Sequence, residues 1–218
     1  MVDTAPLASG RDADVFAIDA RRVLRRYRKG GDVAAEATIM RYVAGFGFPV
    51  PTVHEAHGPD LVLDRVDGPT MASALAAGKL GLGDAAEQLA DLHRRLHELP
   101  PRLGRDPGAR VLHMDLHPEN VMLSSGGPVV IDWRNATEGP PDLDVALSAV
   151  ILAQVAVDET HVWSGPAKVL LTAFLRRVGG NPIRVLNQAV AIREADPGLT
   201  ADEVDKLGAA ARLVTQCR

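Results

Sequence analysis

A polar loop between short apolar runs most constrains how this chain of 218 residues can fold. The loop His113-Met-Asp-Leu-His-Pro-Glu-Asn120 stands between the apolar segments Val111-Leu112 and Val121-Met-Leu123. A further acid, Asp132, directly follows the apolar run Val129-Val-Ile131. Short apolar runs bounded by turn residues are typical of buried strands. We therefore expect a fold in which adjacent strand ends present several polar side chains to one cleft.

Three of these polar residues suit a magnesium site. Asp115 and Asn120 are five residues apart, and Asp132 follows twelve residues later. Carboxylate and amide oxygens are ligands that Mg²⁺ prefers, often together with phosphate oxygens. Phosphoryl transfer uses such a set, because one carboxylate accepts the proton of the substrate hydroxyl while the other groups hold the metal ions. The spacing therefore favours phosphoryl transfer.

The histidines permit a second interpretation, a zinc hydrolase. The pattern His-x-Asp-x-His that begins at His113 has a spacing that could ligate zinc, and His93 and His97 are four residues apart on an expected helix. Catalytic zinc usually has three protein ligands and one open position. This interpretation leaves Asn120 and Asp132 without a role. We favour the view that His93 and His97 belong to the polar face of an amphipathic helix.

The first 67 residues predict a small β-rich unit. Apolar and polar residues alternate here as in half-buried strands, and glycines and prolines separate the runs. Asp32 is the expected N-cap of the helix in this unit. The expected elements are strands over residues 14–18, 22–27, 53–57 and 61–65, an earlier strand near Leu7, and a helix over residues 33–44.

After Gly68 the pattern becomes mostly helical. A short helix is expected over residues 71–77, and a longer one, capped by Asp84, reaches Glu98. The apolar stretch Val145–Val157 is too short to span a bilayer and predicts a buried core helix. We therefore expect an α+β fold with a small β-rich N-lobe (residues 1–67) and a mostly helical C-lobe (residues 68–218).

The loop at residues 113–120 and the segment Ile131-Asp-Trp133 resemble motifs of the aminoglycoside phosphotransferase and choline-kinase-like family. In that family Asp-Trp stands where protein kinases have Asp-Phe-Gly. The resemblance implies a protein-kinase-like bilobal fold, with ATP and Mg²⁺ as cofactors. The implied site residues are Asp115 as catalytic base, Asn120 and Asp132 as metal ligands, and His117 near the transferred phosphate. A protein kinase fits less well, because the loop lacks the Arg of His-Arg-Asp.

Weaker motifs extend the resemblance to the N-terminal part. Alternation places Val23 and Arg25 on one face of a strand, where kinases carry the lysine that grips the nucleotide phosphates. Glu36 would orient that cation. The segment 9–16 would cover the phosphates, and Leu61–Gly68 resembles the strand and hinge that bind the adenine edge. The implied nucleotide-binding residues are Gly10, Val15, Val23, Arg25, Glu36, Asp64, Arg65 and Val66.

Three further positions bear on this resemblance. Arg25 replaces the usual lysine, and arginine is always charged and binds phosphate as a fork. Met114 stands where many members of the family carry a glycine. The segment Pro141-Asp-Leu-Asp144-Val-Ala146 also resembles the family, in which an Asp near this position supports the active-site loops.

Composition excludes several classes of partner. The formal net charge of −4 gives no electrostatic footprint for nucleic acid. The one cysteine, Cys217, cannot form a disulfide within the chain, which fits a cytoplasmic location. We expect a small-molecule hydroxyl acceptor as the partner, no nucleic acid, no membrane, and a monomer or weak homodimer.

The leading hypothesis is an ATP-dependent phosphotransferase acting on a hydroxyl of a small molecule. The alternative is a nucleotide-binding pseudokinase or regulatory module without transfer activity, which Arg25 and the glycine-poor loop at residues 9–16 motivate. The acceptor stays open. A polycationic aminoglycoside would need a cluster of acids, for which the candidates are Asp142, Asp158, Glu159, Glu194, Asp196, Asp202, Glu203 and Asp205.

Overall fold

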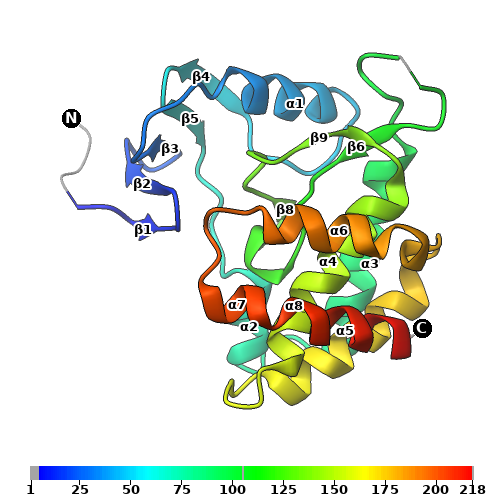
Figure 1. The fold of residues 1–218 in the computed structure, drawn as a ribbon. Coiled ribbons are helices and arrows are strands. Elements are labelled where there is room, and N and C mark those ends of the chain that lie inside the picture. Colours follow the sequence, from blue (N-terminus) through cyan, green and yellow to red (C-terminus); the bar gives the residue numbers. More distant parts are fainter. Residues whose placement is uncertain (1–4, 105, 218) are drawn as a thin grey trace.

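The computed structural model describes residues 5–104 and 106–217. Its N-terminal part is a five-stranded antiparallel sheet with strand order β1-β2-β3-β5-β4, and a mostly helical part follows (Figure 1). This is the predicted protein-kinase-like arrangement of a small β-rich part and a larger helical part. The N-terminal elements are β1 Ala8–Ser9, β2 Ala13–Ala17, β3 Arg22–Tyr27, α1 Ala34–Gly45, β4 Val53–His57 and β5 Asp60–Asp64.

The register of the sheet places the expected nucleotide-binding residues on one face. Val15 pairs with Arg25, and Ala17 pairs with Val23. Directly paired residues of antiparallel strands share a face, and alternate residues do so along each strand. Val15, Val23 and Arg25 therefore lie on the same face of the sheet. The tight connection before β3 forms because the Asp19 carboxylate accepts hydrogen bonds from the backbone N–H groups of Arg21 and Arg22, both at 2.8 Å.

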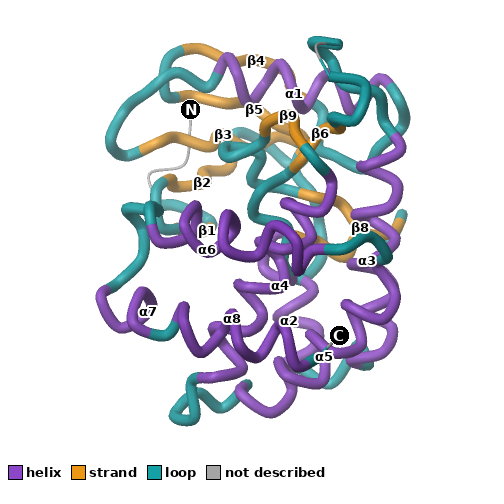
Figure 2. The backbone as a smooth tube through the Cα atoms, turned by 45° about the vertical axis from the view of Figure 1, so that its right-hand side comes forward, coloured by secondary structure: helices purple, strands orange, loops and turns teal. Residues whose placement is uncertain are grey.

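The C-terminal part combines helices with two small two-stranded sheets, β6 with β9 and β7 with β8 (Figure 2). Its helices are α2 Met71–Ala76, α3 Leu82–Glu98, α4 Pro141–Val157, α5 Ser164–Val178, α6 Leu186–Glu194, α7 Ala201–Asp205 and α8 Leu207–Gln216. Two short 3₁₀ turns are η1 Pro118–Asn120 and η2 Pro182–Val185. The strands are β6 Arg110–Leu112, β7 Val121–Ser124, β8 Gly127–Val130 and β9 Thr137–Gly139.

Helix α4 forms the centre of the helical part, as the apolar stretch Val145–Val157 predicts. It is buried around nearly its whole circumference and contacts α3, α5, α6 and α8. A helix that is apolar on all sides is stable only when neighbours cover each side. Among the described residues, no helix is long and apolar enough to cross a membrane.

Both N-cap predictions are wrong. The N-cap of α1 is Val33, and Asp32 instead accepts a hydrogen bond from Ala34 N (2.8 Å) one residue before the cap. The N-cap of α3 is Gly81, so Asp84 lies in the first turn. A carboxylate there still interacts favourably with the helix dipole, which explains why its sequence signal resembles that of a cap.

Gly68 marks the junction between the two parts. Its φ is +127°, and a Cβ at this position would lie 2.1 Å from the carbonyl oxygen of Leu123 in β7. Only glycine allows that approach. The next residues continue the contact, since Leu123 N donates to Pro69 O at 2.8 Å. The expected lobe boundary between residues 67 and 68 stays a prediction.

Candidate active site

Backbone pairing brings the predicted catalytic loop (residues 113–120) next to Asp132. Ile131 N donates to Asn120 O at 3.0 Å, so the start of β7 lies beside the end of β8. The Asn120 amide nitrogen donates to the backbone oxygen of Asp115 at 2.9 Å and lies 3.2 Å from its Oδ2. Asp115 and Asn120 are therefore in direct contact. Asp132 follows Ile131 directly.

The predicted base, Asp115, lies beside His117 and Arg193. His117 Nε2 lies 3.6 Å from Asp115 Oδ1 and 3.2 Å from the Asn120 amide nitrogen. Burial alone would raise the pKa of Asp115, but the neighbouring His117 and the charge of Arg193 bring it below its usual value. Asp115 is thus ionised at neutral pH and can accept a proton.

Asp132 adopts an uncommon backbone conformation, with φ +64°. The following residue, Trp133, is fully buried, and its indole N–H donates to Val130 O at 3.0 Å. The ring packs edge-on against His113 and Phe48, at centroid distances of 4.8 and 5.7 Å. This packing holds the turn and leaves the Asp132 side chain 40% exposed.

Arg25 connects β3 to two acids, Glu36, which was predicted to orient it, and Asp132. Its guanidinium lies 2.6 Å from Glu36 Oε1 and 2.5 Å from Asp132 Oδ1. Tyr27 donates a hydrogen bond to the other Glu36 oxygen at 2.7 Å. Burial would lower the pKa of Arg25, but the carboxylates of Asp132 and Glu36 raise it, so the guanidinium is permanently charged. The pairing with Asp132 was not predicted.

The loop at Gly10 is exposed and held by arginines. Arg28 donates to Gly10 O at 2.7 Å, and Gly10 N donates to Ala13 O at 2.9 Å. Arg134, two residues after Asp132, pairs with Asp12 of this loop at 2.8 Å. Ion pairs therefore join the loop to the segment that follows β8.

The predicted hinge, residues 64–66, continues directly from β5. Asp64 accepts a hydrogen bond from His54 Nε2 at 2.7 Å, and Arg65 N donates to Arg21 O at 2.7 Å. The N–H of Arg65 is therefore already used. A cavity of about 340 Å³ adjoins this segment, but Val15, Val23 and Arg25 do not line it. The cavity is therefore lined by the predicted hinge and not by the sheet face that carries Val15, Val23 and Arg25.

Comparison with family models identifies the chain. The model of the phosphotransferase enzyme family matches residues 3–110 and 105–167. The chain belongs to this family of phosphotransferases. Comparison with curated protein sequences gives no match.

Solved structures share the fold of this chain at low identity. The ternary complex of APH(2″)-IIa with streptomycin and ATP superposes with a TM-score of 0.62 and 14% identity, over 98% of this chain and 93% of that chain. The aminoglycoside-3′-phosphotransferase of type VIII gives 0.56 and 20%, over 100% and 93%. The amicoumacin kinase hAmiN, solved with AMP-PNP, Ca²⁺ and Ami, gives 0.55 and 12%, over 99% and 88%.

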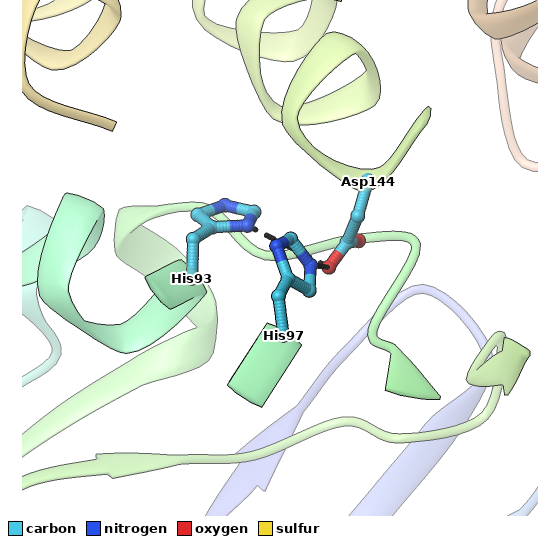
Figure 3. Close-up of side chains that lie close together, drawn as sticks. All are labelled: His93, His97 and Asp144. Carbon is cyan, nitrogen blue, oxygen red and sulfur yellow. Dashed lines mark hydrogen bonds and ion pairs between the residues drawn. The ribbon is translucent and has the colours of Figure 1, made fainter. Parts of the chain in front are cut away.

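A buried polar network supports the loop at residues 113–120, the predicted catalytic loop. Asp144, at the start of α4, accepts hydrogen bonds from Met114 N (2.7 Å), His113 N (3.2 Å) and His97 Nε2 (2.9 Å). His93 Nδ1 lies 3.6 Å from the same carboxylate (Figure 3). Asp144 is fully buried, and although burial would raise its pKa, His93 and His97 hold that pKa well below its usual value.

The interpretation of His93 and His97 as a polar helix face is wrong. His93 is fully buried, lies 3.0 Å from Ser148 Oγ and packs against Phe174. Ser148 in turn donates to Leu116 O in the catalytic loop at 2.6 Å. The helical spacing contained the signal, because His93 lies four residues after Leu89 and three before Leu96, on the apolar stripe.

Proposed function

We propose that this chain transfers the γ-phosphoryl group of ATP to a hydroxyl of a small molecule, with Asp115 as the base. The observation that carries the proposal is the contact of an ionised Asp115 with Asn120, whose backbone pairs with the residue before Asp132. In phosphoryl transfer the protein acts mainly by positioning and electrostatics, and this arrangement supplies both.

The transfer step forms one bond to the γ-phosphorus and breaks another. The acceptor hydroxyl oxygen attacks the γ-phosphorus, and its proton passes to the Asp115 carboxylate. The bond from the γ-phosphorus to the β,γ-bridging oxygen breaks, and its electron pair leaves with ADP. The products are ADP and a phosphate monoester. His117, 3.6 Å from Asp115 Oδ1, would donate a hydrogen bond to the transferred group.

The donor atoms next to Asp115 fit a magnesium ion. The Asn120 amide nitrogen donates to Asp115, which directs the carbonyl oxygen of Asn120 elsewhere, and Asp132 supplies a half-exposed carboxylate. Asn120 and Asp132 would hold Mg²⁺ through hard oxygen ligands. The bound ion would neutralise charge on the nucleotide phosphates. Arg25, braced by Glu36, would bind the phosphates as a fork.

One observation favours a second candidate, a nucleotide-binding module that does not transfer phosphate. The Arg25 guanidinium lies 2.5 Å from Asp132 Oδ1, so a cation already neutralises the carboxylate that would bind the metal. An enzyme must exchange this ion pair for Mg²⁺ and nucleotide. A module that binds nucleotide without metal can keep the ion pair between Arg25 and Asp132.

Nucleotide binding and turnover separate the two candidates. Thermal unfolding is measured with Mg²⁺ and ATP and with ATP plus EDTA, and ADP release is then measured over alcohols, amino alcohols, sugars and aminoglycosides. The proposal expects magnesium-dependent stabilisation and acceptor-dependent ADP release. Asp132→Asn should lose the magnesium dependence, while Asp67→Asn, whose side chain is 82% exposed, should keep it. Stabilisation without ADP release for any acceptor would favour the second candidate.

A further inference from the structure

An arginine from α6 lies beside the predicted base. Arg193 Nη1 is 3.8 Å from Asp115 Oδ1, and its side chain is only 14% exposed. In both views of the fold, α6 lies between the strands and the lower helices (Figures 1 and 2). The acceptor hydroxyl must approach Asp115. An acceptor at that carboxylate would therefore lie within reach of a fixed positive charge.

Two neighbouring side chains, Gln154 and Asp196, hold the guanidinium of Arg193 in place. Its Nε donates to Gln154 Oε1 at 3.1 Å, and Gln154 on α4 is anchored because its amide nitrogen donates to Glu203 O at 3.0 Å. Arg193 Nη1 also pairs with Asp196 at 3.0 Å, and Asp196 accepts a hydrogen bond from Gly198 N at 2.8 Å. A guanidinium held in this way loses little further freedom when it binds a ligand.

Most of the acids that a polycationic acceptor would need already form ion pairs or hydrogen bonds within the chain. Lys206 pairs with Asp158 at 2.8 Å and with Asp202 at 2.5 Å. Arg11 pairs with Glu203 at 2.7 Å, and Asp142 accepts a hydrogen bond from Asn181 N at 2.7 Å. Of the other candidates, Asp196 is paired with Arg193, while Glu159, Glu194 and Asp205 are exposed. Five of the eight candidate acids, Asp142, Asp158, Asp196, Asp202 and Glu203, are therefore already engaged by groups of the chain itself.

We propose that Arg193 makes the acceptor site selective for a hydroxylated anion, whose carboxylate or phosphate binds the guanidinium while its hydroxyl faces Asp115. This inference rests on the proposed function. Because Nη1 and Oδ1 are 3.8 Å apart, a molecule that contacts both has its hydroxyl and its anionic group only a few bonds apart. Compact hydroxy acids, hydroxylated amino acids and small sugar phosphates meet this condition. A polycation does not meet it, because its positive charges would lie next to the positive charge of Arg193.

Matched acceptor pairs test the selectivity with the full chain, Mg²⁺ and ATP. Each pair shares a hydroxylated skeleton and differs in charge: a hydroxy acid and its amide, a sugar phosphate and its sugar. A polycationic amino sugar completes the panel. We expect kcat/KM to be about 10- to 100-fold higher for the anionic member, the range of a charge-assisted hydrogen bond. Comparison of the two pairs shows whether carboxylate or phosphate is the natural group.

Two variants separate recognition from support of the fold. Arg193→Gln should raise the KM for the anionic acceptor about 10- to 100-fold, leave the neutral acceptor nearly unaffected and leave the KM for ATP unchanged. Arg193→Lys should restore part of the selectivity, because it keeps the charge but not the fork. Arg184→Gln, at an exposed arginine of η2, is the control and should change neither class of acceptor.

Three results would overturn the inference in different ways. Equal losses for charged and neutral acceptors in Arg193→Gln would indicate a purely structural role. Turnover of the amino sugar or of the neutral members as efficient as that of the anions would refute the selectivity while leaving the proposed function intact. ADP release with none of the acceptors would refute the proposed function itself, and this inference with it.

Discussion

Replacing Asp144 by asparagine removes the one charge on which the support of the catalytic loop depends. The carboxylate is fully buried and accepts hydrogen bonds from Met114 N, His113 N and His97 Nε2. Asparagine keeps the shape but replaces one acceptor oxygen by an NH₂ group. Whichever way the amide turns, this group faces either the Met114 N–H or the His97 Nε2–H.

The magnitude follows from the contacts that are lost. Hydrogen bonds to a charged group contribute about 1.5–3 kcal/mol each, and breaking a buried charge pair costs about 3–5 kcal/mol. We expect Asp144→Asn to lower the free energy of unfolding by about 3–5 kcal/mol. In a protein of this size about 1 kcal/mol shifts Tm by roughly 2–4 °C, so Tm should fall by roughly 6–20 °C.

Equilibrium unfolding in urea at neutral pH measures this change, and thermal unfolding provides the second readout. Asp67→Asn is the matched control, because its side chain is 82% exposed and a single surface pair contributes little. It should stay within about 0.5 kcal/mol of the parent chain. A loss of less than about 1 kcal/mol in Asp144→Asn would mean that the buried carboxylate does not support the loop, and the reasoning would be refuted.

Three further changes test the local geometry. Met114 has φ +66°, a conformation that glycine adopts freely and that a β-branched residue adopts only with strain. In urea unfolding, Met114→Gly should therefore change the free energy of unfolding by less than about 1 kcal/mol, and Met114→Val should lower it by about 2 kcal/mol. Equal losses in the two variants would contradict this. Gly68→Ala places a Cβ 2.1 Å from Leu123 O and should lower stability by more than about 3 kcal/mol, whereas Gly126→Ala, with nothing closer than 3.7 Å, should have little effect on Tm. Burial lowers the pKa of His113 from 6.5 in the folded chain, so as the pH falls the unfolded chain protonates this histidine first. The free energy of unfolding should therefore fall by about 1.4 kcal/mol per pH unit below pH 6.5. A urea-unfolding profile that is flat from about pH 7 to 5 would contradict the burial of a neutral His113.

Local patterns were sufficient to predict much of the fold. The strand Arg22–Tyr27 was predicted with its observed bounds, because its alternation is clear and Asp19 closes the turn before it. The buried helix over residues 145–157 followed from its unbroken apolar run, although the structure begins α4 at Pro141. Such features depend on neighbours in the sequence, and a single sequence contains that information.

Contacts between distant residues could not be predicted in the same way. Arg25 and Asp132 are separated by 107 residues, and nothing in either segment indicates that they meet. The same holds for Arg193 and Asp115, because α6 carries no motif that relates it to the catalytic loop. The burial of His93 was not predicted because histidine is intermediate between the buried and the exposed residue types, so residue type alone does not decide its position. Here Ser148 and Asp144 provide His93 with buried polar neighbours.

The most direct test of the central claim follows the phosphoryl group itself. The full chain is incubated with Mg²⁺, γ-labelled ATP and an acceptor that supports ADP release, and ³¹P NMR quantifies the products. We expect equal amounts of ADP and labelled phosphate monoester. We also expect that Asp115→Asn still binds Mg²⁺ and ATP but turns over about 10²- to 10⁴-fold more slowly. Label that appears only as inorganic phosphate, or an Asp115→Asn variant as fast as the parent chain, would contradict the account.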